Sequence, residues 1–125
     1  MKFLTEEWAQ AVTDALNGSE AFRQAAGSQA TRLQQVVSTP EGEVKYYLKL
    51  EDGKAEVGLG EIDDAEATIG QDYPTAAAIS KGEMNLPAAF MSGKLRVNGN
   101  MMKLMQLQGV GSAISQAIKD VDVEY

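Results

Sequence analysis

Residues 87–108 read PAAFMSGKLRVNGNMMKLMQLQ, and this stretch decides the fold that we expect for the chain. Gly93 divides it, because glycine favours the end of a helix and the residues before it place apolar side chains one helical turn apart. After it, Leu95 and Val97 alternate with basic and polar residues, as in a strand with one buried face. Asn100 is a good N-cap for the residues that follow. We therefore expect a helix over 86–91, capped by Asn85, a strand over 94–98 and a helix over 101–108.

Methionine is concentrated in this part of the chain. Apart from Met1, every methionine lies between Met84 and Met105. The helix expected over 101–108 is apolar around most of its circumference, so it must be covered on more than one side or face something apolar that is not protein. Methionine is flexible and polarizable, and it suits both an ordinary core and the wall of an adaptable pocket. From the residues alone, both interpretations stay open.

Upstream of this stretch the hydrophobic pattern has the period of two that is typical of strands. Apolar side chains occupy every second position from Val44 to Leu50, and the Asp-Gly pair at 52–53 predicts a hairpin turn after them. Connections between successive strands are short, which favours antiparallel pairing. We expect strands over 32–38, which has the weakest pattern, 44–50, 55–59, 65–69 and 94–98. They predict a five-stranded, mostly antiparallel sheet covered on one face by helices.

N-cap residues precede apolar stripes of helical period at three further places. We expect helices over 5–16, 19–26 and 72–81, opened by Thr5, Ser19 and Asp72. Near the C-terminus, Gly109-Val110-Gly111 predicts a break, followed by a last helix that starts at Ser112 and has a single apolar stripe. No repeat or linker divides these elements. The sequence therefore predicts one α+β domain over 1–125.

Composition and charge exclude several classes of function. The chain has 11 basic and 18 acidic residues and a net charge of -7, which argues against nucleic acid as a partner. It contains no histidine and no cysteine, which excludes Ser-His and Cys-His catalysis and zinc sites built on imidazole or thiolate. We interpret the acidic residues at 61–66 as a solvated turn rather than a cation site. We expect no enzyme, no catalytic residue, no metal and no cofactor.

The sequence also predicts where the chain acts. No run of consecutive apolar residues approaches the ~20 that a membrane-spanning helix needs. The N-terminal residues turn acidic where a signal peptide would be apolar, so we expect a cytoplasmic protein. A sheet face with Lys45, Lys49, Lys94 and Arg96 would permit transient contact with an anionic membrane surface. An ordinary solvated face is the simpler interpretation of these bases.

Residues 87–108 resemble the signature of the sterol carrier protein 2 (SCP-2) family. That signature has an alanine-phenylalanine pair, Gly-Lys-Leu, an alternating strand, Gly-Asn-Met and then a helix with leucine and methionine. The corresponding residues are Ala89-Phe90, Gly93-Lys94-Leu95, Val97, Gly99-Asn100-Met101, Met105, Leu107 and Gln108. The expected order of elements is also similar to that of the family, in its single-domain bacterial form. The chain departs from the pattern at Met102, where glycine is common, and at Lys103, where an apolar residue is usual.

The resemblance implies a non-catalytic carrier that holds a fatty acid, acyl-CoA, phospholipid or sterol in a hydrophobic tunnel between the sheet and the helices. The lipid-binding residues expected from it are Phe90, Met91, Leu95, Val97, Met101, Leu104, Met105, Ile114 and Ile118. We expect the last helix to close the tunnel as a lid hinged at Gly109 and Gly111, in a monomer or weak dimer. One alternative is a protein-interaction or dimerisation module that uses the same apolar groove. A second is an enzyme or enzyme accessory acting on an acyl or steroid substrate.

Overall fold

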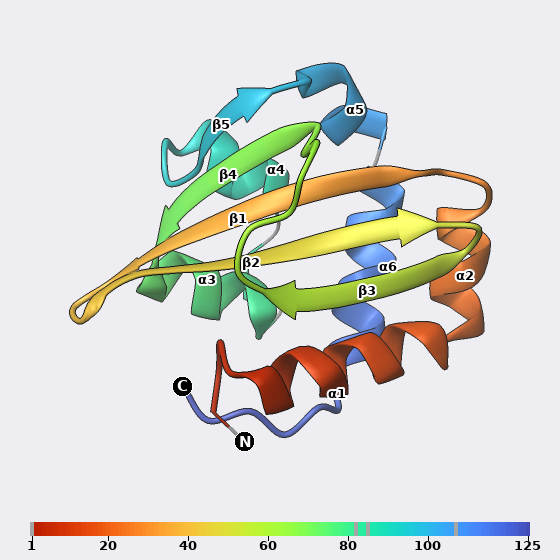
Figure 1. Ribbon diagram of the computed structural model, residues 1–125, viewed down its shortest axis with the longest axis horizontal. Helices are drawn as coiled ribbons and strands as arrows, with labels where there is room; N and C mark the ends of the chain where they lie inside the picture. The colour runs from red at the N-terminus through yellow and green to blue at the C-terminus, as the bar shows by residue number, and fades with distance from the viewer. Residues whose placement is uncertain (1, 82, 85, 107) are drawn as a thin grey trace.

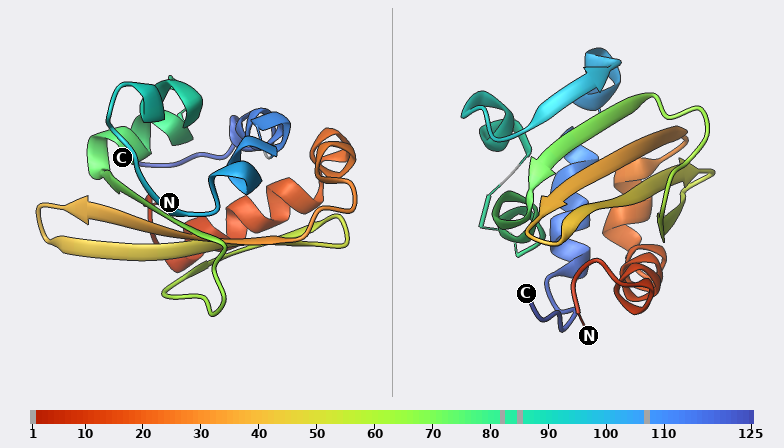
Figure 2. Two further views of the ribbon diagram at one scale, coloured as in Figure 1. Left: turned by 90° about the horizontal axis from the view of Figure 1, so that it is seen from above. Right: turned by 60° about the vertical axis from the view of Figure 1, so that its left-hand side comes forward.

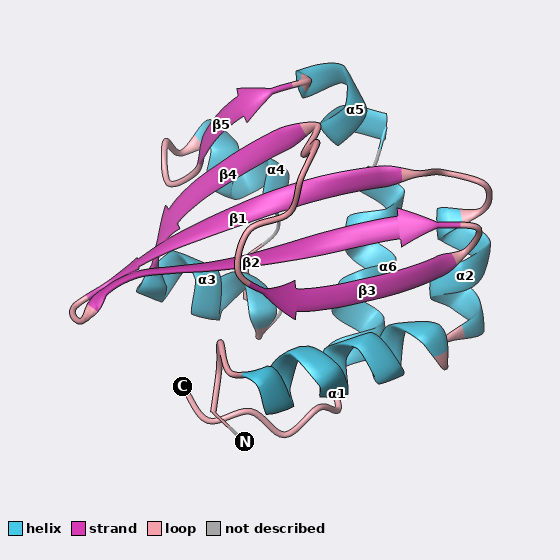
Figure 3. Cartoon of the chain, viewed as in Figure 1, coloured by secondary structure: helices cyan, strands magenta, loops and turns pink. Residues whose placement is uncertain are grey.

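The computed structural model describes residues 2–81, 83–84, 86–106 and 108–125, which form one sheet with helices packed on one face (Figures 1 and 3). The strands are β1 (Thr31–Thr39), β2 (Gly42–Glu51), β3 (Lys54–Leu59), β4 (Ala67–Asp72) and β5 (Arg96–Gly99). The helices are α1 (Glu6–Asn17), α2 (Glu20–Ala26), α3 (Tyr73–Ser80), α4 (Leu86–Met91), α5 (Met101–Gln106) and α6 (Gln108–Ile118). Seen from above in Figure 2, the helices lie on one side of the sheet and a loop lies on the other.

The strand order is β3-β2-β1-β4-β5, with β1 in the middle. Three of the neighbouring pairs are antiparallel, whereas β1 and β4 are parallel. The parallel pair arises because the chain leaves β3 at one edge and crosses the outer face of the sheet before it enters β4 beyond β1 (Figure 1). The prediction of a five-stranded, mostly antiparallel sheet covered on one face is confirmed.

Two glutamines explain why β1, the central strand, has the weakest strand pattern in the sequence. Gln34 is buried on the outer face, where it holds the crossing loop: its Nε2 donates to the carbonyl of Gly60 at 3.0 Å, and its Oε1 accepts from the amide of Ile62 at 2.8 Å. Gln35 is buried on the inner face, where its Oε1 accepts from Gln71 Nε2 at 2.7 Å. Both glutamines interrupt the apolar alternation, and both are buried because they have hydrogen-bond partners.

The main core lies between the inner face of the sheet and the helices α1, α2 and α6. Val37 and Leu50 on the strands and Leu16 and Phe22 on the helices are among its least accessible side chains. The predicted N-caps are confirmed, since side-chain oxygens of Thr5, Ser19 and Asp72 accept hydrogen bonds from the amides three residues further on, at 3.3, 3.2 and 2.9 Å. Each cap satisfies an amide that the first helical turn leaves unpaired.

The last helix differs from the prediction. α6 begins at Gln108, so Gly109-Val110-Gly111 lies in its first turn, and the expected break before a helix starting at Ser112 is wrong. Val110 is 2% exposed and belongs to the main core. Burying it contributes about 2 kcal/mol, which offsets much of the roughly 1 kcal/mol that each neighbouring glycine costs in a helix. α6 contacts all five other helices, so it forms the centre of the helical layer.

Candidate functional site

The interior contains two apolar clusters that meet at β5. The main core is one of them. The second consists of Ile69 on β4, Ala89 on α4 and Leu95 just before β5, with Met84 partly buried against it. Val97 on β5 packs against both clusters. We call this boundary, marked by Leu95 and Val97, the seam.

Gly93 positions the first residue of the seam. It adopts φ +77°, a left-handed conformation that favours glycine. This turn ends α4, with the amide of Gly93 donating to the carbonyl of Phe90 at 3.1 Å and that of Lys94 to the carbonyl of Ala89 at 2.9 Å. Leu95, which follows, is 6% exposed. The Gly-Lys-Leu segment is therefore a helix end followed by a buried anchor.

Gly99 and Asn100 connect the seam to α5. Gly99 adopts φ +118°. A Cβ atom at this position would overlap the backbone of Glu66 and Ala67, at the start of the neighbouring strand β4. The amide of Asn100 donates to the carbonyl of Glu66 at 2.9 Å, and its Oδ1 accepts from the amide of Lys103 at 3.1 Å. The predicted cap at Asn100 is confirmed. It fixes the start of α5 directly against the end of β5.

The residues expected to bind lipid lie in three different places. Leu95 and Val97 lie at the seam, whereas Ile114 and Ile118 on α6 are partly buried against the main core. Phe90, Met91 and Met101 lie at the surface, where these residues are 44%, 87% and 38% exposed. Leu104 and Met105 lie on α5, and their side chains fall outside the described part. As lipid contacts, these residues all stay predictions.

The sequence reasoning missed a polar group on the inner face. Gln35 and Gln71 are hydrogen-bonded to each other there, and Tyr46 is the cross-strand partner of Gln35. Burial raises the pKa of Tyr46, so its hydroxyl stays protonated at neutral pH. The ring of Tyr46 lies 5.2 Å from that of Trp8, whose buried indole N–H has no hydrogen-bond partner among the described atoms. The sequence contains one signal for this group: Gln35 stands between Leu33 and Val37, at a position that the strand pattern assigns to the buried face.

This inner wall is suited to binding and offers little for chemistry. Most of its buried residues are apolar, and the polar groups described above are two neutral amides and a protonated phenol. Small-molecule sites generally combine an apolar lining with a few such groups. A general acid or base would need a pKa near neutrality, and the raised pKa of Tyr46 lies on the wrong side for a base.

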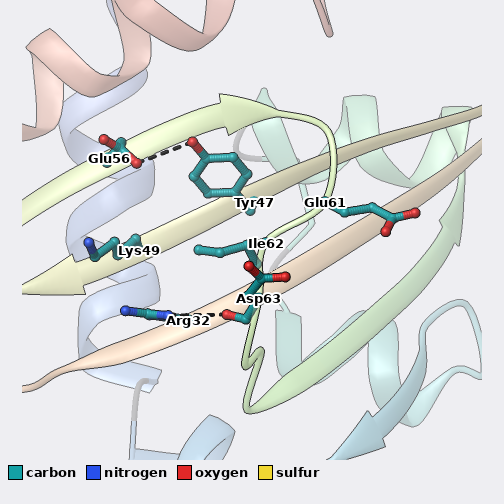
Figure 4. A pocket seen from close by; sticks show the side chains of 7 residues that line it. All are labelled: Arg32, Tyr47, Lys49, Glu56, Glu61, Ile62 and Asp63. Carbon is teal, nitrogen blue, oxygen red and sulfur yellow. Dashed lines mark hydrogen bonds between the residues drawn. The ribbon is translucent and has the colours of Figure 1, made fainter.

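The outer face of the sheet has a shallow polar hollow (Figure 4). Arg32, Tyr47 and Glu56 line it from three strands, together with Ile62 and Asp63 of the crossing loop. The Tyr47 hydroxyl donates to Glu56 Oε2 at 3.1 Å, and burial together with this carboxylate raises the pKa of Tyr47. Arg32 donates to the carbonyl of Asp63 at 3.2 Å. The hollow is polar and internally bonded, so it does not suit an apolar ligand.

The acidic residues at 61–66 form an exposed turn, as predicted. Lys45 Nζ lies 2.8 Å from Glu61 Oε1, and this pairing lowers the pKa of Glu61. Arg32 lies 3.9 Å from Asp64. Within the described ranges, no group of acidic side chains is arranged to hold a metal ion. None of the helices in those ranges is long and apolar enough to span a bilayer.

The sequence of this fold matches a known family. Residues 19–111 match the model of the SCP-2 sterol transfer family. The chain belongs to this family. Among its SCP-2 relatives, sterol carrier protein 2 of Gallus gallus is 32% identical over 68 residues, and that of Bos taurus is 34% identical over the same length. Each match spans 54% of this chain and 12% of the relative.

Solved SCP-2 structures share the whole fold. A crystal structure of sterol carrier protein 2 is 28% identical with a TM-score of 0.81, and the match covers 97% of this chain and 100% of that one. A conserved hypothetical protein of Thermus thermophilus is also 28% identical with a TM-score of 0.82, covering 99% and 92%. Palmitated SCP2L2 of Aedes aegypti, at 20% identity and a TM-score of 0.62, covers 91% and 95% and shares the fold alone.

Proposed function

We propose that this protein binds a lipid in its apolar interior and carries it without chemical change. The observation that carries the proposal is the family match over residues 19–111, together with an inner face that is apolar and divided into two clusters. The cargo class is a fatty acid, acyl-CoA, phospholipid or sterol. The palmitate held by the Aedes aegypti relative makes a single acyl chain the first cargo to test.

The proposed tunnel follows the seam. Leu95 and Val97 would contact the acyl chain from the sheet side, and Ile114 and Ile118 from α6, which contacts both α4 and α5. An acyl chain inserted here would separate two clusters that already pack as distinct units, so it would disturb the main core little. Leu104 and Met105 belong to this proposal through their place on α5, and Phe90, Met91 and Met101 would form the outer rim.

The structure changes how the tunnel would open. A lid hinged at Gly109 and Gly111 does not fit, because these residues lie inside α6 and Val110 between them is anchored in the main core. α4 and α5 are short helices of six residues each. Short helices depend on tertiary packing for their stability, so we assign the opening movement to α4 and α5, with α6 as the fixed wall.

The expected affinity suits a carrier. Burying about 14 methylenes at ~0.8 kcal/mol each gives roughly 11 kcal/mol, against association costs of ~4–15 kcal/mol. At the low end of that cost the net gain is about 7 kcal/mol, which corresponds to a dissociation constant in the micromolar range. The lack of histidine and cysteine fits carriage rather than catalysis. A chain without cysteine also suits the reducing cytoplasm, where we place the protein.

Binding of a fluorescent fatty acid to wild type and to a variant with a filled seam tests the proposal. In Val97→Phe, the larger ring would occupy the boundary of the two clusters, and we expect at least tenfold weaker binding. Val44→Phe is the matched control, because Val44 is also partly buried against the main core but lies on β2. Native mass spectrometry of the purified protein should show a co-purified lipid. Equal binding by both variants would contradict the proposed site, and no binding by wild type would contradict lipid carriage.

A further inference from the structure

One row of side chains crosses the inner face of the sheet at the level of the seam. The strand register places Tyr46 of β2 opposite Gln35 of β1. The same register places Gln35 opposite Ile69 of β4, and Ile69 opposite Val97 of β5. Neighbouring strands lie about 4.8 Å apart, so Gln35 is roughly 10 Å from Val97 across the sheet. The buried polar side chains of the inner face therefore lie two strands from the seam, in the same row.

Gln35 and Gln71 leave part of their hydrogen-bonding capacity unused. Both are buried, and Gln71 Nε2 donates to Gln35 Oε1 at 2.7 Å. Within the described part of the chain, Gln35 Nε2 and Gln71 Oε1 have no hydrogen-bond partner. Buried polar groups in proteins are generally paired. The two amides therefore offer both a donor and an acceptor to a third group.

Two further donors beside this pair are unused. Trp8 is 4% exposed, and its indole N–H has no hydrogen-bond partner among the described atoms. Its ring lies 5.2 Å from that of Tyr46. The Tyr46 hydroxyl also makes no hydrogen bond within the described ranges, and burial raises its pKa, so it remains a donor at neutral pH. Leaving several buried donors unpaired is costly, which points to a partner that is not part of the fold.

The inner face has no fixed charge to pair with an ionised head group. Among the described residues, the buried polar side chains are two threonines and three glutamines, all of them neutral. Charged side chains of the central strands, such as Arg32 and Lys49, line the polar hollow on the outer face instead (Figure 4). Moving an ion into an apolar interior without a countercharge is very unfavourable. The partner of the two amides is therefore an uncharged polar group.

We propose that Gln35 and Gln71 bind an uncharged hydroxyl at the polar end of the cargo lipid. A hydroxyl both donates and accepts, so it would donate to Gln71 Oε1 and accept from Gln35 Nε2. The hydrocarbon chain would then extend along the seam, past Ile69 and Val97, towards α4 and α5. This inference rests on the proposed function. It adds the class of head group that the site selects and the direction of the bound lipid, with the polar end innermost.

The pattern of donors and acceptors predicts an order of affinity among lipids of one chain length. A fatty alcohol can use both amides. A methyl ester has no proton to donate, so it leaves Gln71 Oε1 unpaired and should bind about fivefold more weakly. An ionised fatty acid also lacks this proton and would bring a charge to the neutral face, so it should bind at least about tenfold more weakly than the alcohol.

Titrations with 1-dodecanol, methyl laurate and laurate at pH 8 test this order. Trp8 is the only tryptophan in the chain, so its fluorescence reports binding beside the site without a label. In Gln35→Leu/Gln71→Leu, dodecanol should bind at least about tenfold more weakly, whereas laurate should bind as it does to wild type. Replacing both partners of a hydrogen bond by apolar side chains of similar size changes stability little, so this variant should fold. Gln34→Leu, the same substitution on the outer face of β1, is the matched control and should keep the preference for the alcohol.

A measurement on wild type alone complements the variants. In nuclear magnetic resonance spectra, the side-chain amide signals of Gln35 and Gln71 should shift when dodecanol is added and should shift much less with laurate. Signals that do not respond to the alcohol would show that the two amides only link β1 to β4, and would overturn the proposal.

The titrations separate this inference from the carrier function. Equal affinities of wild type for dodecanol and laurate would overturn the hydroxyl site and leave the carrier intact. A preference for the alcohol that persists in Gln35→Leu/Gln71→Leu would also overturn it, because the two amides would then not be its cause. If none of the three lipids binds to wild type, the carrier function itself is contradicted.

Discussion

The two edges of the sheet are completed in different ways. At the β3 edge, side chains of α1 take the place of a further strand. Thr13 Oγ1 accepts from the amide of Val57 at 2.9 Å. Asn17 Oδ1 accepts from the amide of Ala55 at 2.8 Å, and its Nδ2 donates to the carbonyl of the same residue at 2.9 Å. The backbone groups of Ala55 and the amide of Val57 at this edge are thus bonded within the molecule, which opposes pairing of the edge with another chain.

At the β5 edge, the strand is short and its flanking helices are small. On these helices, Met91 and Met102 are 87% and 72% exposed. No contact comparable to those of Thr13 and Asn17 is found at this edge in the described ranges. The two edges therefore differ in role: contacts with α1 stabilise the β3 edge, whereas the β5 edge lies beside α4 and α5, where we propose that cargo enters.

The largest effect is expected at Gly99, the point where the β5 edge approaches other backbone most closely. Gly99→Ala combines a positive φ with an overlap between the new Cβ and the backbone of Glu66 and Ala67, so the free energy of unfolding should fall by about 3–5 kcal/mol. Gly93→Ala is the matched control, because Gly93 also has a positive φ but open space around it. It should cost about 1–2 kcal/mol. Urea unfolding compares the two, and equal losses would contradict the close approach.

A smaller effect should follow from opening the β3 edge. Asn17→Ala leaves the amide and carbonyl of the buried Ala55 without their helix partner, which should cost about 2 kcal/mol. Hydrogen exchange at the Ala55 amide should accelerate accordingly. Gln10→Ala, which removes an exposed hydrogen bond to Asp14 on the same helix, should cost less than about 0.5 kcal/mol. If both variants unfold alike, α1 does not close this edge.

The stability contributed by Asp72, near the β5 edge, should depend on pH. This residue ends β4, beside β5, and caps α3. In the folded state the pKa of Asp72 lies below its ordinary value of 3.8. Hydrogen bonds from Thr75 are the main cause, and the positive charge of Lys94 adds to the effect. The stabilisation is therefore present above about pH 4 and is lost as the pH falls through the lower, folded pKa. Asp72→Ala should cost about 1 kcal/mol at pH 7, and this difference from wild type should shrink on acidification.

Asp72→Asn is the control for that measurement. Asparagine is a comparable N-cap but does not titrate, so the variant should remain close to wild type at pH 7 and keep its stability contribution below pH 4. Thermal unfolding across the acidic range separates the three proteins. A difference between wild type and Asp72→Ala that stays constant down to low pH would show that the ionised carboxylate has no role.

Local patterns in the sequence predict much of this fold. The N-caps at Thr5, Ser19, Asp72 and Asn100 were all predictable, because capping depends on one side chain and the amide three residues further on. The alternation of apolar and polar residues predicts β2 and β3, because it too is a pattern between near neighbours in the sequence. The parallel pairing of β1 with β4 was not predictable in this way, since it results from a loop that Gln34 holds across the sheet.

Long-range packing explains where the predictions were wrong or incomplete. Gly109-Val110-Gly111 suggests a break by local propensity, yet Val110 is buried in the main core and the helix continues through it. The motif around β5 correctly indicated the family, but it could not distinguish Leu95, which is buried, from Met91, which is exposed. Neither Thr13 nor Asn17 has a pattern of its own, because their partners lie about 40 residues away in the sequence.

The smallest effect on stability is expected where the β5 edge is most exposed. Met91→Gln/Met102→Gln keeps helix propensity nearly constant and removes two side chains that are mostly in contact with solvent. The free energy of unfolding should therefore change by less than about 1 kcal/mol. An ordinary core role for these methionines predicts a loss of several kcal/mol instead, so urea unfolding distinguishes the two. Because both side chains are mostly exposed, an unchanged stability would show that the fold does not depend on them.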